Sequence, residues 1–138
     1  RVPGTKDHYL LNPFGYLFDE ITASSLVKVD LDGNNVDHSP HRIHRAGFVI
    51  HSAIHAARPD AHCVMHTHTT TGMAVASLKD GLSPTNFYAA QLNGKVAYHE
   101  FEGITVNPDE KGRLLASIGA KLSHHAPRPY RPVFHQLA

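Results

Sequence analysis

The sequence has little of what marks a secreted, membrane-spanning or nucleic-acid-binding protein. Cys63 is its only cysteine, which excludes an internal disulfide framework and fits a reducing compartment. No apolar run approaches the ~20 residues of a membrane-spanning helix, and there is no signal-peptide pattern. A net charge of +1 gives no electrostatic basis for binding nucleic acid or an anionic membrane. We therefore expect a soluble, cytoplasmic protein that has neither of these partners.

The length of 138 residues is sufficient for one domain with a hydrophobic core. The chain begins at Arg1 without an initiator methionine, so we expect that an N-terminal piece is missing. Residues 122–138 contain three prolines and show neither helical nor strand periodicity. We expect residues 1–121 to form the domain, and residues 122–138 to be an irregular tail. Our hypothesis is that this tail is frame-shifted or otherwise replaced.

Local patterns predict that strands and helices alternate along the domain. β-branched and apolar runs predict strands over residues 26–31, 61–68 and 95–101. Helical spacing and start signals predict helices over residues 46–57, 70–78 and 85–91, and from Asn107 towards Gly119. No internal repeat and no linker divides the chain.

Histidine is abundant, with 13 residues, and His66 and His68 are the most informative of them. They end an apolar run that starts at Cys63, and a segment of small residues follows. Side chains two apart in a strand project to the same side, so these two imidazoles would converge. Such a pair predicts a site for Zn²⁺ or another divalent transition metal, and the alternative is two polar residues that cap a strand. We interpret Cys63 as a small, buried hydrophobic residue rather than a nucleophile.

His51 and His55 lie four residues apart, so they share one face of the predicted helix over residues 46–57. A zincin protease would have a glutamate directly after the first histidine, and Ser52 occupies that position. We therefore favour a solvated or core-satisfied role for this pair, with His51 kept as a weaker metal-ligand candidate.

Tyr98, His99 and Glu100 end the predicted strand over residues 95–101. His99 or Glu100 could place a further imidazole or carboxylate near the metal, and the alternative is a polar strand end. Tyr98 is a candidate proton donor, because phenols act as general acids where a pocket positions them. The third metal ligand stays open among His99, His51 and water.

Residues 47–68 comprise a helix, an Arg-Pro-Asp turn and a strand that ends in His-x-His. This arrangement resembles the class II aldolase/adducin family. The similarity continues upstream through residues 11–15 and 19–23, and downstream through residues 97–103 to about Gly119. It covers roughly residues 1–121.

The resemblance implies a three-layer α/β/α fold with a central mixed β-sheet, assembled into homo-oligomers that are commonly tetramers. It also implies a Zn²⁺ site, where His66 and His68 match two of the three family histidines. Enzymes of the family split or rearrange sugar phosphates and related hydroxy-ketones. In such lyases zinc polarises a carbonyl and a protein carboxylate moves the proton. In this chain, if it is active, Tyr98 or Glu100 is the candidate for proton transfer.

The chain departs from the sugar-phosphate aldolases at three places. Gly47 occupies the position of their acid/base glutamate. The turn that contains Asn12 and Gly15, our candidate substrate-binding residues, has fewer hydroxyl groups than their phosphate-gripping turns. After Lys121 there is no Asn-His-Gly motif to supply the third zinc histidine. The alternatives are therefore a degenerate fragment or a non-catalytic adducin-like domain that binds a partner of the actin–spectrin type.

Overall fold

The structure is a computed structural model. It describes residues 1–100, 102–103 and 107–119, and the backbone of residues 132–135. The elements in chain order are β1 (Tyr9–Leu11), the 3-10 helix η1 (Phe18–Glu20), β2 (Val27–Val29), α1 (Arg45–Ala57), β3 (Cys63–His66), α2 (Thr70–Ala76), α3 (Phe87–Ala90), α4 (Glu110–Ile118) and β4 (Pro132–His135).

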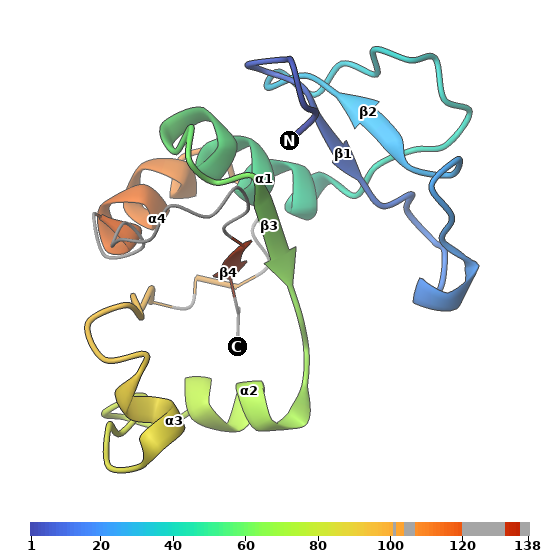
Figure 1. The fold of residues 1–138 in the computed structure, drawn as a ribbon. Coiled ribbons are helices and arrows are strands. Elements are labelled where there is room, and N and C mark those ends of the chain that lie inside the picture. Colours follow the sequence, from blue (N-terminus) through green and yellow to red (C-terminus); the bar gives the residue numbers. More distant parts are fainter. Residues whose placement is uncertain (101, 104–106, 120–131, 136–138) are drawn as a thin grey trace.

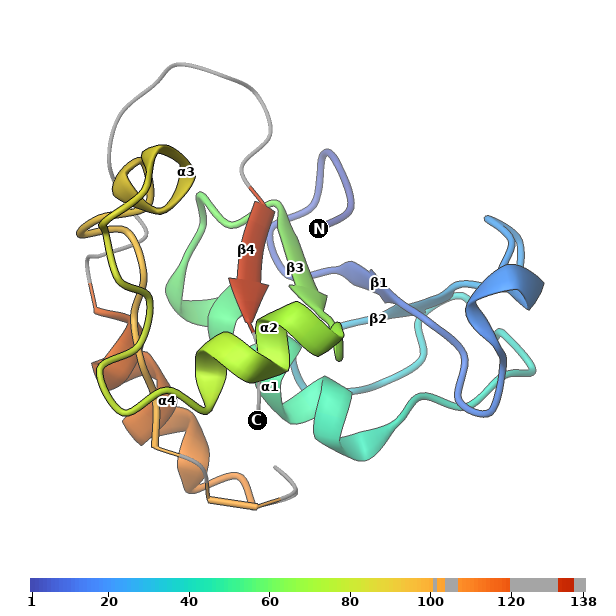
Figure 2. The ribbon, with the colours of Figure 1, turned by 90° about the horizontal axis from the view of Figure 1, so that it is seen from below.

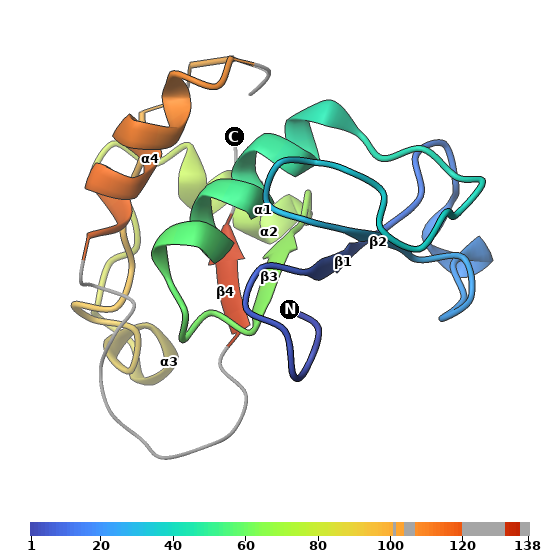
Figure 3. The same cartoon turned by 90° about the horizontal axis from the view of Figure 1, so that it is seen from above.

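The described strands form two separate pairs. β1 and β2 are antiparallel, with Tyr9 opposite Val29. β3 and β4 are parallel, with His66 opposite His135, and Figure 2 shows these two strands side by side. Figure 3 shows the β1–β2 pair at the side of the β3–β4 pair. Parallel and antiparallel pairing therefore both occur, but the described residues form two small sheets instead of the single central sheet that we expected.

Helix α1 is at the centre of the packing, beside α4 and β3 (Figure 1). Ile50 and Ile54 lie one turn apart and are both buried, because the apolar residues of α1 recur at helical spacing. Burial of each such side chain stabilises the fold by about 1.5–3 kcal/mol. The cluster consists of Ile50, Ile54, Ala61, Val64, Leu114 and Ile118.

A second buried cluster lies under the β1–β2 pair, where successive side chains alternate between the inside and the outside. Its buried residues are Tyr9, Leu11, Val27 and Val29. The partly buried Phe48 of α1 packs against them. Because α1 contributes to both clusters, it joins the β1–β2 pair to the rest of the described chain. Helices α2 and α3 project away from both clusters (Figure 1).

The helix predictions are confirmed: α2, α3 and α4 each lie within their predicted segments, and α1 starts one residue before its own. The strand predictions over residues 26–31 and 61–68 are confirmed by β2 and β3. The predicted strand over residues 95–101 is wrong: residues 95–100 have no regular structure, and residue 101 lies outside the described residues. This segment contacts α4 through side chains, and in the described part of the chain no strand pairs with it.

Two further expectations concern β3 and its neighbour. Cys63 is exposed rather than buried, because Val64 points into the core and the residues on either side of it point the other way. β4 forms within a segment that we expected to be aperiodic, and Pro132 is tolerated as its first residue. The rest of residues 122–138 lies outside the described residues, so the domain boundary at residue 121 stays a prediction. None of the described helices combines the length and the apolar character needed to cross a bilayer.

Candidate functional site

His66 and His68 come together where β3 ends and the chain turns towards α2. His66 is the last residue of the strand, and the Nε2 atoms of the two rings lie 2.6 Å apart. The ring centroids are 4.5 Å apart, with the ring planes at 74°. Thr69 caps the start of α2, because its hydroxyl accepts a hydrogen bond from the Gly72 amide at 3.3 Å. The strand and the capped helix therefore fix both sides of the histidine pair.

The Nε2 separation can be compared with what a shared metal requires. Two nitrogens bound to one tetrahedral zinc, each at about 2.0–2.1 Å, lie about 3.3 Å apart. The two rings already direct Nε2 atoms at each other, so a small outward shift of the side chains would produce that spacing. His66 is half-buried and His68 is exposed, which leaves the pair open on one side. The pair fits a divalent ion that two neutral imidazoles bind.

The third ligand is not supplied by a ready-made cluster. No group of three or more His, Cys, Asp or Glu side chains that could hold a metal occurs within residues 1–100, 102–103 and 107–119. Of our two candidates, His99 contacts residues of α4, and His51 interacts electrostatically with His66. The described residues therefore offer two convergent imidazoles, and His51 is near enough to His66 to interact with it electrostatically.

On α1, His55 is buried, as the core-satisfied interpretation predicts, and His51 is half-buried. The Tyr9 ring lies 4.7 Å from the His55 ring and 6.4 Å from the His51 ring, centroid to centroid. His55 Nδ1 lies 3.1 Å from the Ala61 carbonyl oxygen, and this side of the ring is its donor to the turn after α1. Burial, and then the positive charge of His66, lower the pKa of His51 to about 4. Burial, and then the positive charges of the N-terminal amine and Arg1, lower the pKa of His55 to about 4. At neutral pH both rings are uncharged.

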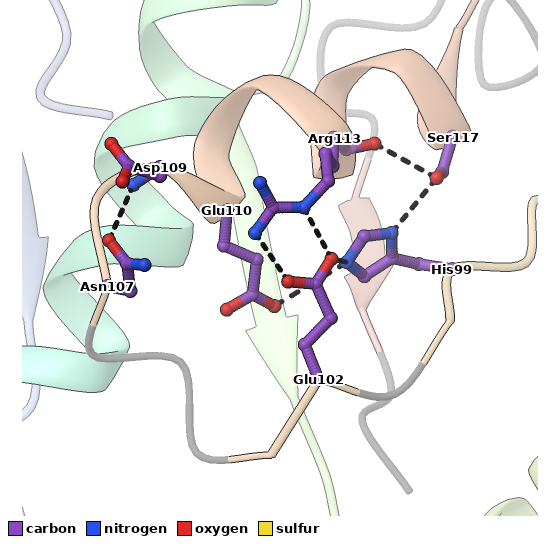
Figure 4. A network of polar contacts seen from close by, with 7 residues as sticks. All are labelled: His99, Glu102, Asn107, Asp109, Glu110, Arg113 and Ser117. Carbon is purple, nitrogen blue, oxygen red and sulfur yellow. Dashed lines mark hydrogen bonds and ion pairs between the residues drawn. The ribbon is translucent and has the colours of Figure 1, made fainter.

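His99 is the centre of a polar network on α4 (Figure 4). Its Nδ1 atom lies 2.9 Å from the Ser117 hydroxyl. Its Nε2 atom lies 3.5 Å from a carboxylate oxygen of Glu110 and 3.8 Å from one of Glu102. Arg113 donates two hydrogen bonds to Glu102, at 2.7 and 2.5 Å, and its guanidinium lowers the pKa of that carboxyl.

Sequence reasoning missed this network, although part of its pattern is visible in the chain. Glu110, Arg113 and Ser117 recur at intervals of three and four residues, so they share one face of α4. What the sequence did not reveal is that this face meets His99. The expectation that His99 lies near the metal pair therefore has no support in the described contacts.

Tyr98 and Glu100 are on the outside of the same segment. The Tyr98 hydroxyl accepts a hydrogen bond from the Leu82 amide at 2.6 Å, and the ring lies directly against Gly81. Tyr98 is 53% exposed, and Glu100 is exposed as well. The structure therefore puts both candidate proton-transfer groups at the surface, with Tyr98 fixed to the turn before α3.

The candidate substrate-binding residues Asn12 and Gly15 lie near the start of the chain, and Gly47 lies near the start of α1. Asn12 and Gly15 are exposed in the turn after β1, and Gly15 needs its positive φ of 90°. This turn is tied to the loop before α1, because the Phe14 amide donates to the Arg42 carbonyl at 2.7 Å. Gly47 is in the first turn of α1, and a Cβ atom added there would meet nothing within 4 Å.

Comparison with known proteins places these features in a family context. The family described as "Class II Aldolase and Adducin N-terminal domain" matches residues 1–127. A provisionally named class 2 aldolase protein of Caulobacter vibrioides is 52% identical over 121 residues, which are 88% of this chain and 47% of that protein. Alpha-adducin of Rattus norvegicus is 48% identical over 123 residues, or 88% of this chain and 17% of that protein. The chain thus spans about half of the bacterial relative, and less of the adducin.

Two solved structures have a similar fold over most of this chain. An aldolase II superfamily protein from Pseudomonas syringae matches with a TM-score of 0.81 and 55% identity, over 86% of this chain and 48% of that chain. The L-fuculose 1-phosphate aldolase from Glaciozyma antarctica PI12 matches with a TM-score of 0.65 and 34% identity, over 84% of this chain and 45% of that chain. The fold is therefore that of the class II aldolases.

Proposed function

This chain belongs to the class II aldolase and adducin family, and on that premise we propose that it is the metal-binding part of a zinc-dependent lyase. Its substrate class is a small hydroxy-carbonyl compound, such as a sugar phosphate. The observation that carries the proposal is the convergence of the His66 and His68 Nε2 atoms to 2.6 Å at the end of β3. The 34% identity to an L-fuculose 1-phosphate aldolase supports the substrate class.

The proposed roles of the residues follow from their donors, acceptors and exposure. His66 and His68 would hold the zinc ion, with water or a further residue completing its coordination. When bound, the ion would polarise the substrate carbonyl. Tyr98 would donate or accept a proton through its hydroxyl, with Glu100 as the second candidate. The exposed turn of Asn12 and Gly15 would contact the substrate.

Gly47 limits the activity that we expect. It occupies the position where sugar-phosphate aldolases of the family have the acid/base glutamate, and it has no side chain to move a proton. General acid–base catalysis contributes roughly 10²–10⁴-fold to a rate. We therefore expect slow turnover of sugar phosphates, or a substrate that needs less help with proton transfer.

We propose that the protein works as an assembly of several copies. It is a homo-oligomer, a tetramer as in the enzymes of the family, with a three-layer α/β/α arrangement around a mixed sheet, and it works in the cytoplasm. Exposed aromatic side chains support the oligomer: Phe87 is 75% exposed and Tyr88 is 81% exposed, with their ring centroids 5.6 Å apart on α3. Aromatic residues are enriched at protein interfaces.

The test measures metal content and turnover on the same preparations. The variants are His66→Ala/His68→Ala and, as a matched control, His38→Asn, which removes an exposed histidine far along the chain from β3. We expect near-stoichiometric zinc in the wild type and the control, and none in the double variant. Zinc-dependent cleavage of L-fuculose 1-phosphate should follow the same order. Zinc-free wild-type protein after purification without chelators would contradict the proposal.

A non-catalytic, adducin-like interaction domain is the second candidate. Gly47 favours it, because this substitution removes a catalytic group, and the 48% identity to alpha-adducin is consistent with it. In this case His66 and His68 are a remnant, and the partner is a protein of the actin–spectrin type. Zinc binding without turnover of any hydroxy-carbonyl compound, together with co-sedimentation with spectrin–actin complexes, would support this candidate over the lyase.

A further inference from the structure

Residues 98–100 alternate between the outside and the inside of the molecule. Tyr98 is 53% exposed, the His99 side chain is 10% exposed, and Glu100 is exposed. Such alternation is what an extended segment produces, because successive side chains point to opposite sides. His99 is therefore the inward residue between the two outward side chains that could transfer protons.

The inward side of this segment meets α4 through the network of Figure 4. The Ser117 hydroxyl has one proton, and it donates to the Arg113 carbonyl oxygen at 3.0 Å. Towards His99 the same oxygen accepts, so the His99 Nδ1–H group is the donor in the 2.9 Å contact. The other nitrogen, Nε2, faces the carboxylates of Glu110 and Glu102. Each ring nitrogen thus faces an oxygen atom that can accept a hydrogen bond.

Helix α4, which makes these contacts, is itself packed against the core. Leu114 and Ile118 are buried in the cluster under α1, and Glu110 is only 4% exposed at the start of the helix. The helix begins at an Asx turn, in which the Asp109 amide donates to the Asn107 side-chain oxygen at 3.0 Å (Figure 4). A side chain that is fixed to this face of α4 is therefore fixed to the core.

On the outward side, Tyr98 has one contact that reports its position. The Leu82 amide donates to the Tyr98 hydroxyl at 2.6 Å, and the Tyr98 ring covers Gly81 so closely that no Cβ atom would fit there. The contact holds only while residues 98–100 stay in place. The exchange of the Leu82 amide hydrogen with solvent is therefore a local measure of where Tyr98 lies.

We propose that His99 is a positioning residue: through Ser117 and Glu110 it fixes to α4 the segment that presents Tyr98 and Glu100 at the surface. The proposal rests on the proposed function for the catalytic meaning of Tyr98, but the placement itself does not need turnover. It also replaces the expectation that His99 binds the metal. The His99 Nδ1–H group donates to Ser117, and the Nε2 atom faces the carboxylates of Glu110 and Glu102.

Hydrogen–deuterium exchange of the intact chain tests the placement. The variants are His99→Ala, His99→Gln and Ser117→Ala, with His38→Asn as the matched control. We expect the Leu82 amide to exchange at least about ten-fold faster in His99→Ala than in the wild type. His99→Gln should restore most of the protection, because its side-chain amide can still donate to a carboxylate. Ser117→Ala should give a smaller increase, and it replaces His99→Ala if that variant does not fold.

The amide of Ile54 separates positioning from general destabilisation. It lies in the core of α1, so it exchanges faster only if the fold as a whole loses stability. Faster exchange at Leu82 with an unchanged rate at Ile54 supports the proposal. An unchanged Leu82 rate in His99→Ala would overturn it, and so would an equal acceleration at Leu82 and Ile54. Absence of turnover in the wild type contradicts only the lyase function, because the exchange rates are measured without substrate.

Discussion

The chain has two pairs of imidazoles in different surroundings. His51 and His55 lie on α1, and His66 and His68 lie at the end of β3 and just beyond it, the pair after β3. The α1 pair is packed against the Tyr9 ring, and His55 is 3% exposed. The pair after β3 is open to solvent on the His68 side, and its Nε2 atoms converge. The same kind of side chain thus packs in the interior at His55, and we propose that it serves as a metal donor at His66 and His68.

Burial decides which of these uses is possible. A buried imidazole stays neutral and needs its nitrogens for the surrounding backbone, as His55 does with the Ala61 carbonyl. An exposed imidazole at a strand end keeps a lone pair that a metal can use. If this comparison is correct, variants of the α1 pair change stability, and variants of the pair after β3 change metal binding.

The largest effect on stability is expected from His55→Ala. The substitution leaves a cavity beside Tyr9 and removes the partner of the Ala61 carbonyl, so we expect the free energy of unfolding to fall by about 2–4 kcal/mol. The Kd for zinc should not change. Urea denaturation and zinc titration calorimetry measure the two quantities. The comparison would be broken if His66→Ala/His68→Ala, measured without metal, lost more stability than His55→Ala.

Zinc itself should stabilise the wild type by mass action, because the unfolded chain does not hold the His66 and His68 rings together. A free zinc concentration 100 times the Kd adds about 2.7 kcal/mol to the free energy of unfolding. A chelator should remove this gain in stability. In His66→Ala/His68→Ala, zinc should not raise the free energy of unfolding. Thermal unfolding with zinc and with chelator measures the difference. An equal gain in the double variant would mean that zinc binds elsewhere.

Acidification should lower the free energy of unfolding over a defined pH range, because His55 is buried. Burial, and then the positive charges of the N-terminal amine and Arg1, lower the pKa of His55 from 6.5 to about 4. Above pH 6.5 the ring is neutral in both states, so it gives no pH dependence. As the pH falls from 6.5 to 4, the unfolded chain binds a proton that the native state rejects, and stability is lost. Below pH 4 the loss levels off.

Between pH 7 and pH 4.5 this single group costs about 2–3 kcal/mol, at about 1.4 kcal/mol for each pH unit within that range. Urea denaturation at several pH values compares the wild type with His55→Asn, which keeps a hydrogen-bond donor and cannot titrate. Carboxyl groups titrate in both proteins, so the difference in slope isolates His55. Parallel slopes for the two proteins would show that His55 is accessible to protons in the native state.

The sequence predicted those parts of the structure that depend on local pattern. The spacing of Ile50 and Ile54 predicted α1, and the alternation around Val27 and Val29 predicted β2, because each pattern matches the period of its element. The convergence of His66 and His68 followed from the same two-residue period. The family also followed from this region, where a helix, a turn and a strand have distinctive residues in sequence.

What could not be predicted depends on contacts between distant segments. Residues 95–100 have the composition of a strand, but a strand requires a partner, and side-chain contacts from His99 to Ser117 and Glu110 hold this segment instead. Cys63 looked buried because its neighbours are apolar, whereas only Val64 of that run faces the core. The sequence gives no indication of which side of a short strand will be covered.

The smallest predicted effect is at Gly47, which precedes His51 by one turn of α1 and belongs to neither histidine pair. Gly47 is the third residue of α1, its φ is not positive, and an added Cβ meets nothing within 4 Å. Gly47→Ala should therefore raise the free energy of unfolding by about 0.5–1 kcal/mol, because glycine loses more conformational freedom on folding. Gly112→Ala in α4, where an added Cβ is also unobstructed, is the matched control.

Gly47→Glu sharpens the comparison further, because it adds a carboxylate to a first turn that has no acidic residue. Position 47 is three residues after the N-cap His44, where a glutamate can reach back to the N-cap amide, so we expect stability at least equal to that of Gly47→Ala. The same carboxylate restores the group that sugar-phosphate aldolases of the family have at this place. Zinc-dependent cleavage of L-fuculose 1-phosphate that is faster in Gly47→Glu than in Gly47→Ala would identify proton transfer as what the wild type lacks. Equal rates in the two variants would place the limit elsewhere, at the substrate contacts or in the ligands that complete the metal site.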